Sequence, residues 1–311
     1  MLKVGIIGLP NVGKSTLFNA LLKKQAALVA NYPFATIEPN IGIVPVPDER
    51  LDKLAQLVKL AEGMIELPPI VPATVKFVDI AGLVKGASQG EGLGNQFLSH
   101  IREVDAIIHV IRDFDDPNVV RAGGSTNPHD DKELVETELA LADIDKQDKL
   151  STKPTLYVYN VSEQNYRQKY SDRNKNVQAN ELVISAKLEE ELVDFSQEER
   201  LEYLKSVGIL ETGLEKLIKA AYKLLGLISF LTAGEKEVRA WTIRLGSTSL
   251  MASGVIHTDF EKKFIKAEVV RFSDFVEVGG WKGAREKGKA RLEGRDYIIK
   301  DGDVIEFKVG A

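Results

Sequence analysis

The chain has 311 residues, no cysteine and a net charge of −5 at pH 7. This length allows two domains with a core each, and the lack of cysteine excludes disulfides and thiolate metal sites. No apolar run is long enough for a membrane span or a signal peptide, so we expect a cytoplasmic protein with no membrane partner. The negative balance gives no general attraction to DNA or RNA, so RNA contact would need a local basic patch.

Residues 8–16 read Gly-Leu-Pro-Asn-Val-Gly-Lys-Ser-Thr and fit the phosphate-binding pattern G-x-x-x-x-G-K-[ST]. An apolar strand is expected just before the pattern and a helix just after it, which is the setting that this loop requires. Backbone N–H groups and the helix N-terminus would hold the phosphates, while a turn that binds nothing is the alternative. The expected nucleotide contacts of this loop are Asn11, Val12, Gly13, Lys14, Ser15 and Thr16.

Short apolar runs and helical patterns alternate as far as about residue 228. The expected strands cover 2–7, 41–46, 74–80, 106–111, 155–159 and 182–184. The expected helices cover 17–22, 51–58, 131–150, 196–208 and 214–225. This alternation predicts an α/β fold with a doubly wound, mainly parallel sheet and phosphate chemistry at the carboxyl ends of its strands.

The pattern changes from Glu237 onward. Short strand-like runs separated by glycine turns are expected at 238–243, 255–257, 265–270 and 304–309. We therefore predict a nucleotide-binding domain over residues 1–228 and a small α+β domain over residues 229–311.

Several motifs stand in a recognisable order: residues 8–16, Thr36, Asp-Ile-Ala-Gly at 79–82, Asn-Val-Ser-Glu at 160–163 and Ser-Ala-Lys at 185–187. With these motifs the chain resembles translation-factor-type P-loop NTPases. Residues 31–34, 37–40 and 79–99 further resemble the YchF or Obg-like ATPase family, and residues 254–261 are similar to the TGS domain of that family.

The resemblance implies an ATPase that hydrolyses ATP with Mg²⁺ and associates with the ribosome, through its large subunit or its RNA. It also implies a β-grasp type of C-terminal domain. Two rival functions remain open, an Obg-type GTPase and a nucleotide-gated RNA-binding or ribosome-binding module with little turnover.

The same resemblance supplies roles for individual residues around the phosphates. Lys14 would reach the terminal phosphates and Ser15 would ligate Mg²⁺. Thr36 would close over the metal when the γ-phosphate is present, and the alternative is that it is an ordinary loop residue. Asp79 would hold the metal through water, and the Gly82 N–H would contact the γ-phosphate.

Leu83 departs from the common pattern, because many relatives place there a glutamine that orients the attacking water. Leucine can neither donate nor accept a hydrogen bond, so another group must do this work. Resemblance to cation-assisted members suggests that Asn11 helps to bind K⁺ beside the phosphates. The alternative is that Asn11 only shapes the loop.

The base is expected to lie against Asn160, Val161 and Glu163, with Ser185, Ala186 and Lys187 completing its site. Guanine-specific relatives usually have Asn-Lys-x-Asp at the first of these motifs, and here valine and glutamate replace the lysine and the aspartate. The Asn160 carbonyl could accept a hydrogen bond from the adenine N6 group. We therefore predict ATP as the preferred nucleotide, and an ordinary strand-end turn is the alternative.

Three further features received no catalytic role. His109 lies in an apolar strand and is interpreted as a core histidine. Residues 282–300 contain seven basic and three acidic side chains, which makes them either an RNA-facing patch or a solvated surface. Residues 128–152 offer a single helix where the family carries a coiled-coil arm, so the arm is either shortened or absent from this sequence.

Overall fold

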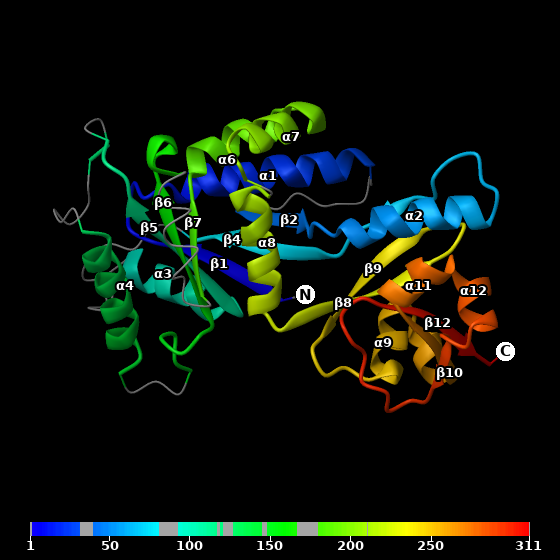
Figure 1. The fold of residues 1–311 in the computed structure, drawn as a ribbon. Helices are drawn as coiled ribbons and strands as arrows, with labels where there is room; N and C mark the ends of the chain where they lie inside the picture. The colour runs from blue at the N-terminus through cyan, green and yellow to red at the C-terminus, as the bar shows by residue number, and fades with distance from the viewer. Residues whose placement is uncertain are drawn as a thin grey trace. The chain divides into compact units, whose positions relative to one another are not determined.

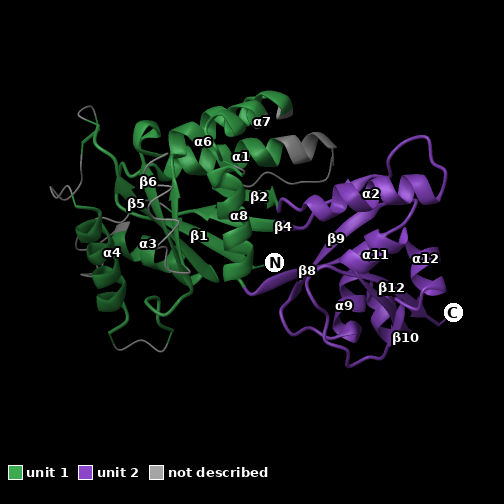
Figure 2. Cartoon of the chain, in the orientation of Figure 1, with its two compact units in different colours: residues 1–45, 75–225 green, residues 46–74, 226–311 purple. Residues whose placement is uncertain are grey.

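The computed structural model describes residues 2–31, 40–80, 93–116, 119–120, 127–144, 148–166, 180–209 and 211–310. The chain divides into two compact units, coloured separately in Figure 2. The first unit contains residues 1–45 and 75–225, and the second contains residues 46–74 and 226–311.

The first unit is built on a six-stranded sheet with the order β2-β4-β1-β5-β6-β7 (Figure 1). Its strands are β1 (Lys3–Ile7), β2 (Ile41–Pro45), β4 (Thr74–Asp79), β5 (Ala106–Asp113), β6 (Thr155–Val161) and β7 (Glu181–Ile184). The pairs β1–β4, β1–β5, β5–β6 and β6–β7 are parallel. This arrangement confirms the predicted doubly wound α/β fold, because the helices between successive strands cover both faces of the sheet.

The helices of this unit are α1 (Lys14–Asn31), α3 (Leu93–Arg102), α4 (Pro128–Ala142), α6 (Ala186–Val193), α7 (Gln197–Ser206) and α8 (Gly213–Leu224). Figure 1 shows α1 and α6 side by side on one face of the sheet, with α3 and α4 on the other. The buried strand β5 carries His109, which is 2% exposed and lies against the Tyr157 ring. Burial lowers the pKa of His109 to about 3, so this histidine is a neutral core residue, as predicted.

The helix expected over residues 131–150 is shorter than predicted. It begins at Pro128 after the N-cap Asn127 and ends at Ala142. The Asp143 carboxylate accepts hydrogen bonds from the N–H groups of Leu150 and Ser151, at 2.7 and 2.8 Å, and folds the chain back on itself. This turn ends the helix at a point where the composition alone favoured its continuation.

The second unit contains a mixed six-stranded sheet with the order β11-β10-β12-β8-β9-β3. Its strands are β3 (Ile70–Val71), β8 (Leu227–Ala233), β9 (Val238–Arg244), β10 (Phe264–Arg271), β11 (Arg291–Glu293) and β12 (Asp303–Val309). Its helices are α2 (Glu49–Ala61), α9 (Ser249–Ile256), α10 (Thr258–Lys262), α11 (Phe272–Val278) and α12 (Trp281–Glu286). Phe230, Val269 and Ile305 lie in its core, which confirms a separate α+β unit.

Residues 46–74 belong to the second unit and not to the first domain, where the sequence analysis placed them. Strand β3 pairs in parallel with β9, so that Ile70 lies opposite Val238. The Arg50 guanidinium binds Asp48 at 2.7 Å and Asp301 at 2.8 Å. These are long-range contacts between segments far apart in sequence, which a boundary drawn along the chain could not include.

The strand expected at residues 255–257 is wrong, because this segment ends helix α9. The Thr248 hydroxyl accepts a hydrogen bond from the Met251 N–H and caps that helix. Ala252 and Ser253 turn into the core, which small side chains in a helix allow. The capping residue lies seven residues before the apolar run that suggested a strand.

The basic residues of 282–300 are partly neutralised within the second unit. Arg285 binds Glu268 at 2.8 Å and Glu306 at 2.6 Å. Lys289 binds Asp274 at 3.3 Å, and Arg291 lies 3.4 Å from Glu293. Much of the positive charge counted in the sequence is therefore already paired, which weakens the interpretation of this stretch as an RNA-facing patch.

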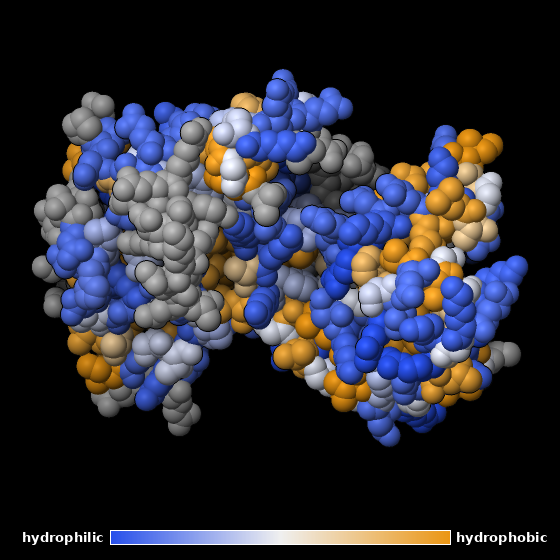
Figure 3. Space-filling model, viewed as in Figure 1, coloured by the Kyte–Doolittle hydropathy of each residue, from blue (hydrophilic) through white to orange (hydrophobic). Residues whose placement is uncertain are grey.

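Apolar side chains gather on the surface near the end of α2 and in the loop that follows it, as Figure 3 shows. Leu60 is 82% exposed and Ile65 is 92% exposed. None of the helices in the described part of the chain combines the length and the apolarity needed to cross a bilayer.

Candidate nucleotide site

The predicted site residues come together because the strands that precede them are parallel. The carboxyl ends of β1, β4, β5, β6 and β7 lie at one edge of the sheet. Ile6 of β1 lies opposite Asp79 of β4, and Asn160 of β6 lies opposite Ile184 of β7. The phosphate loop, Asp79, Asn160 and the segment 185–187 therefore leave the sheet at the same edge, where nucleotides bind in this fold.

The phosphate loop has the backbone that its sequence requires. Asn11 and Gly13 have φ angles of 63° and 99°, in the left-handed region. A Cβ on residue 13 would lie 2.2 Å from Nδ2 of Asn160, so only glycine fits there. The helix α1 begins directly after this turn, and its N-terminus supplies unpaired N–H groups for an anion.

Lys14 is buried at the start of α1, and its Nζ donates a hydrogen bond of 2.7 Å to the Leu9 carbonyl. Burial lowers the pKa of Lys14 to about 8, while the nearby Asp79 carboxylate acts in the opposite direction. The ammonium is thus held inside the loop and is sensitive to any further negative charge. A phosphate in the loop would favour its charged form.

Asp79, at the end of β4, has an environment that favours cation binding. Burial raises the pKa of Asp79, and the Lys14 ammonium lowers it. Its Oδ1 is buried and has no hydrogen-bond partner among the residues that the structure describes. A buried carboxylate oxygen without a donor fits a hard cation such as Mg²⁺ or a water bound to it.

Asn160 connects the two halves of the site. Its Nδ2 donates to the Val12 carbonyl at 2.9 Å, and its Oδ1 accepts from the Ala186 N–H at 2.9 Å. We expected this oxygen to accept from adenine N6, but in the structure a backbone N–H is its partner. Asn160 is 5% exposed and bridges the phosphate loop to the segment 185–187.

The other residues of the base motifs are placed differently from one another. Val161 is buried among the core side chains below the site, so its side chain does not take the place of a lysine over the base. Glu163 and Lys187 are exposed. Ser185 is buried, and its Oγ has no hydrogen-bond partner within the described ranges.

The exposed Ser15 and half-buried Thr16 lie at the start of α1, next to Lys14. Thr36, Gly82 and Leu83 lie outside the residues that the structure describes. Their assigned roles therefore remain predictions.

Arg112 was not recognised from the sequence. It is 3% exposed, and its guanidinium donates to the carbonyls of Phe114 and Val119, at 3.2 and 3.1 Å. The next carbonyl, that of Val120, accepts a hydrogen bond of 3.1 Å from Nδ2 of Asn11. Arg112 thus orders a loop that touches the phosphate loop, and an arginine at the end of an apolar strand was the available signal.

Comparison with known proteins agrees with this geometry. A family model described as 50S ribosome-binding GTPase matches residues 3–161, and YchF-GTPase_C, described as "Protein of unknown function (DUF933)", matches residues 227–310. The protein "Ribosome-binding ATPase YchF" of Haemophilus influenzae is 44% identical, with 98% of each chain covered. Its namesake in Bacillus subtilis is 43% identical, with 99% of each chain covered.

The chain belongs to the YchF family. A solved structure, "Structure of the Schizosaccharomyces pombe YchF GTPase", has 34% sequence identity and a TM-score of 0.82, and the match covers 99% of this chain and 97% of that one. The fold described above is therefore the YchF fold in both sheets. The alignment with the Haemophilus influenzae YchF extends over 365 positions, more than the 311 residues of this chain, so that relative has residues that this chain lacks.

Proposed function

We propose that this chain is a cytoplasmic, ribosome-binding ATPase that binds and hydrolyses ATP with Mg²⁺. The observation that carries the proposal is the buried Lys14 beside Asp79, under a loop whose backbone is shaped for phosphate. The names of the curated relatives, "Ribosome-binding ATPase YchF", support the choice of nucleotide and partner. Turnover of ATP by the purified chain, lost on substitution of Lys14, tests it directly.

The residues around the loop fit Mg²⁺. Ser15 at the start of α1 and Asp79, directly or through water, would hold it together with the phosphates, and Thr36 would complete the set. When bound, the metal neutralises negative charge on the phosphates and orients them. The family is generally one of Mg²⁺-dependent P-loop proteins, and the ligand assignment to these residues is ours.

Hydrolysis of the bond to the terminal phosphate depends mainly on positioning and on charge. Lys14 would place its ammonium against the terminal phosphates, exchanging its bond to the Leu9 carbonyl for bonds to phosphate oxygens. The Gly82 N–H would contact the γ-phosphate. Since Leu83 cannot orient water, we expect slow turnover in the isolated chain.

Base choice tests the ATPase against the GTPase alternative, which the names of the fission yeast structure and of one family model both carry. With Asn160 occupied by Val12 and Ala186, selectivity falls to Glu163 and to the segment 185–187. Titration calorimetry with ATP and with GTP separates the two functions. A clear preference for GTP would contradict an ATPase.

Asn11 remains our proposed K⁺ ligand beside the phosphates. Its Nδ2 already donates to the Val120 carbonyl, which leaves the side-chain oxygen as the group that a cation would use. ATPase rates in matched KCl and NaCl buffers decide the matter. Equal rates would show that Asn11 only shapes the loop.

We propose the large ribosomal subunit or its RNA as the partner. Because Arg285, Lys289 and Arg291 are paired within the second unit, residues 282–300 are not assigned as the contact surface. Co-sedimentation with ribosomes in the presence of ATP, ADP or no nucleotide tests the association. If Lys14→Ala binds ribosomes as the wild type does with ATP, a binding module independent of nucleotide is the better description.

A further inference from the structure

Glu189 is a buried carboxylate that the nucleotide chemistry described above does not use. It lies in the first turn of α6 and is 2% exposed. Its Oε1 accepts from the Gly213 N–H at 2.7 Å, and its Oε2 accepts from the Leu214 N–H at 3.0 Å. Both donors belong to the first turn of α8, so one side chain caps a helix that begins 24 residues further along the chain.

The contact between the two helices is closely fitted. A Cβ on residue 213 would lie 2.7 Å from Oε1 of Glu189 and 3.0 Å from a methyl group of Ile184. Glycine at the first position of α8 therefore allows the carboxylate to reach the backbone. Thr212 supplies the conventional N-cap, with its hydroxyl accepting from the Glu215 N–H at 3.1 Å.

Glu189 is also tied directly to the base side of the site. Its own N–H donates to the Ser185 carbonyl at 2.9 Å, in the first turn of α6. One residue further, the Ala186 N–H is held by Asn160, which in turn holds Val12 of the phosphate loop. The segment 185–187 is thus fixed from one side by Asn160 and from the other by Glu189.

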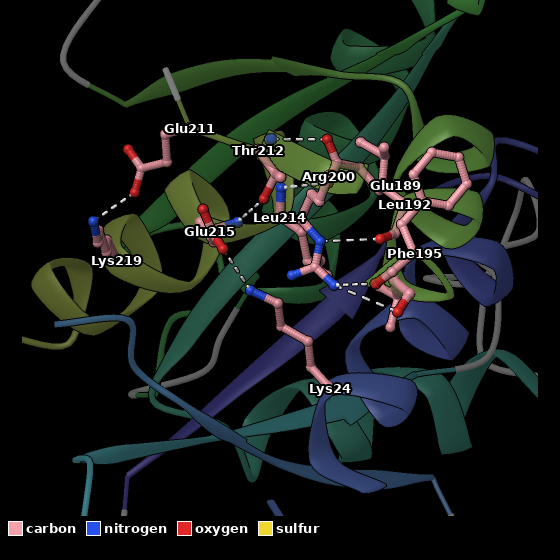
Figure 4. A network of polar contacts seen from close by, with 12 residues as sticks. Lys24, Glu189, Leu192, Phe195, Arg200, Glu211, Thr212, Leu214, Glu215 and Lys219 are labelled. Atoms are coloured by element: carbon pink, nitrogen blue, oxygen red, sulfur yellow. Dashed lines mark hydrogen bonds and ion pairs between the residues drawn. The ribbon is translucent and has the colours of Figure 1, made fainter. Parts of the chain in front are cut away.

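The far end of α6 is fixed as well, as Figure 4 shows. The Arg200 guanidinium donates to the carbonyls of Leu192 and Phe195 at 3.1 and 3.3 Å, which satisfies the C-terminal end of the helix. On α8, Glu215 binds Lys24 of α1 at 3.0 Å. The first turn of α8 is therefore contacted both by the helix that follows the phosphate loop and by the helix that follows the base segment.

We propose that Glu189 is a positioning residue of the nucleotide site, which sets the segment 185–187 for the base by locking α6 against the first turn of α8. The proposal rests on the proposed function in one respect, namely that residues 185–187 contact the base. Since α8 is the last helix of the first unit, the same lock joins the base segment to the end of that unit. Glu189 touches no reacting atom and acts only through α6.

The test measures two ligands with the full-length chain. ATP reports on both the phosphate loop and the base segment, whereas inorganic triphosphate with Mg²⁺ reports on the phosphate loop alone. In Glu189→Gln one carboxylate oxygen becomes an N–H donor that faces a backbone N–H, so the lock is broken without loss of volume. We expect the Kd for ATP to rise about tenfold and the Kd for triphosphate to stay within about twofold.

Glu191→Gln is the matched control, because Glu191 lies on the exposed side of the same helix and its substitution should change neither Kd. Should Glu189→Gln fail to fold, as judged by circular dichroism, Gly213→Ala strains the same contact from α8 and should produce the same split between the two ligands. An unchanged Kd for ATP in a folded variant overturns the proposal. An equal loss for ATP and triphosphate overturns it too, because it would indicate a purely structural role.

Failure of the proposed function has a different signature. If the wild type prefers GTP, the ATPase assignment fails, while the split between the preferred nucleotide and triphosphate in Glu189→Gln still decides the role of Glu189. A wild type that binds neither nucleotide overturns both proposals before any variant is made.

Discussion

The phosphate side and the base side of the candidate site are built in different ways. The phosphate loop is local: its left-handed turns and its helix start lie within residues 8–16, and the Lys14 ammonium bonds a carbonyl five residues away. The base side is assembled from distant segments, with Asn160 holding Val12 148 residues away and Glu189 holding Gly213 24 residues away. Substitutions on the first side should affect ligand binding, and those on the second should affect binding and folding together.

The largest expected effect is on the phosphate side. Replacing Lys14 by alanine removes two charge-assisted hydrogen bonds to phosphate, each contributing about 2 kcal/mol, so ATP affinity should fall about 1,000-fold. Because Lys14 is already desolvated and has a lowered pKa, the free energy of unfolding should change little. Calorimetric titration with ATP and urea denaturation measure the two quantities.

Lys205→Ala, at an exposed position of α7, is the control for Lys14→Ala. If Lys14→Ala instead unfolds the chain and the control does not, the phosphate side is less local than the comparison states.

The second effect is on the pH dependence of stability, through Glu189. Burial raises the pKa of Glu189 to about 7, against the opposing N–H groups of Leu214 and Gly213 and the Lys24 ammonium. The folded chain then keeps a proton that the unfolded chain releases above pH 4.5. This contribution to stability is complete below about pH 4.5 and is lost as the pH rises through about 7.

Urea denaturation of the wild type and of Glu189→Gln between about pH 4.5 and about pH 8 measures this contribution. The free energy of unfolding of the wild type, relative to the variant, should decrease by about 3 kcal/mol over this range. The neighbouring titratable groups are Lys24, Glu215 and Tyr166, and all three are present in both chains. A difference that does not depend on pH would mean that the two N–H donors keep the carboxylate ionised.

The third effect tests the bridge between the two sides. Asn160→Ala leaves the Val12 carbonyl and the buried Ala186 N–H without their partner, which should lower the free energy of unfolding by about 2 kcal/mol. Asn165→Ala, at an exposed position after β6, should cost less than about 0.5 kcal/mol. Equal losses for the two variants would contradict the bridging role.

The smallest effects concern the two ion pairs that α1 makes with the base side. Lys24 and Glu215 have side chains 15% and 24% exposed, whereas Lys23 and Asp194 are 38% and 66% exposed. Lys24→Met should destabilise the chain by about 1 kcal/mol, and Lys23→Met by less than about 0.5 kcal/mol. Chemical denaturation at low and high salt checks this order, and a larger loss for Lys23→Met would reverse it.

Sequence patterns predicted the strands well where the apolar runs were continuous. The runs at 106–111 and 155–159 correspond to β5 and β6, and the capping box of Ser196 and Glu199 marks the start of α7. Patterns failed where a distant residue decides the outcome. The run at 255–257 belongs to the helix capped by Thr248, and residues 46–74 join the second unit through pairing of β3 with β9.

The sequence alone determined the phosphate loop, the expected parallel sheet and the family resemblance, because each of these depends on residues close together in the chain. Only the tertiary structure decided that Asn160 binds Ala186 and Val12, that Arg112 orders a neighbouring loop, and that Glu189 caps α8. The physical reason is that a hydrogen bond is directional and short. Its partner is chosen by how the helices and strands pack, and no spacing along the chain specifies that packing.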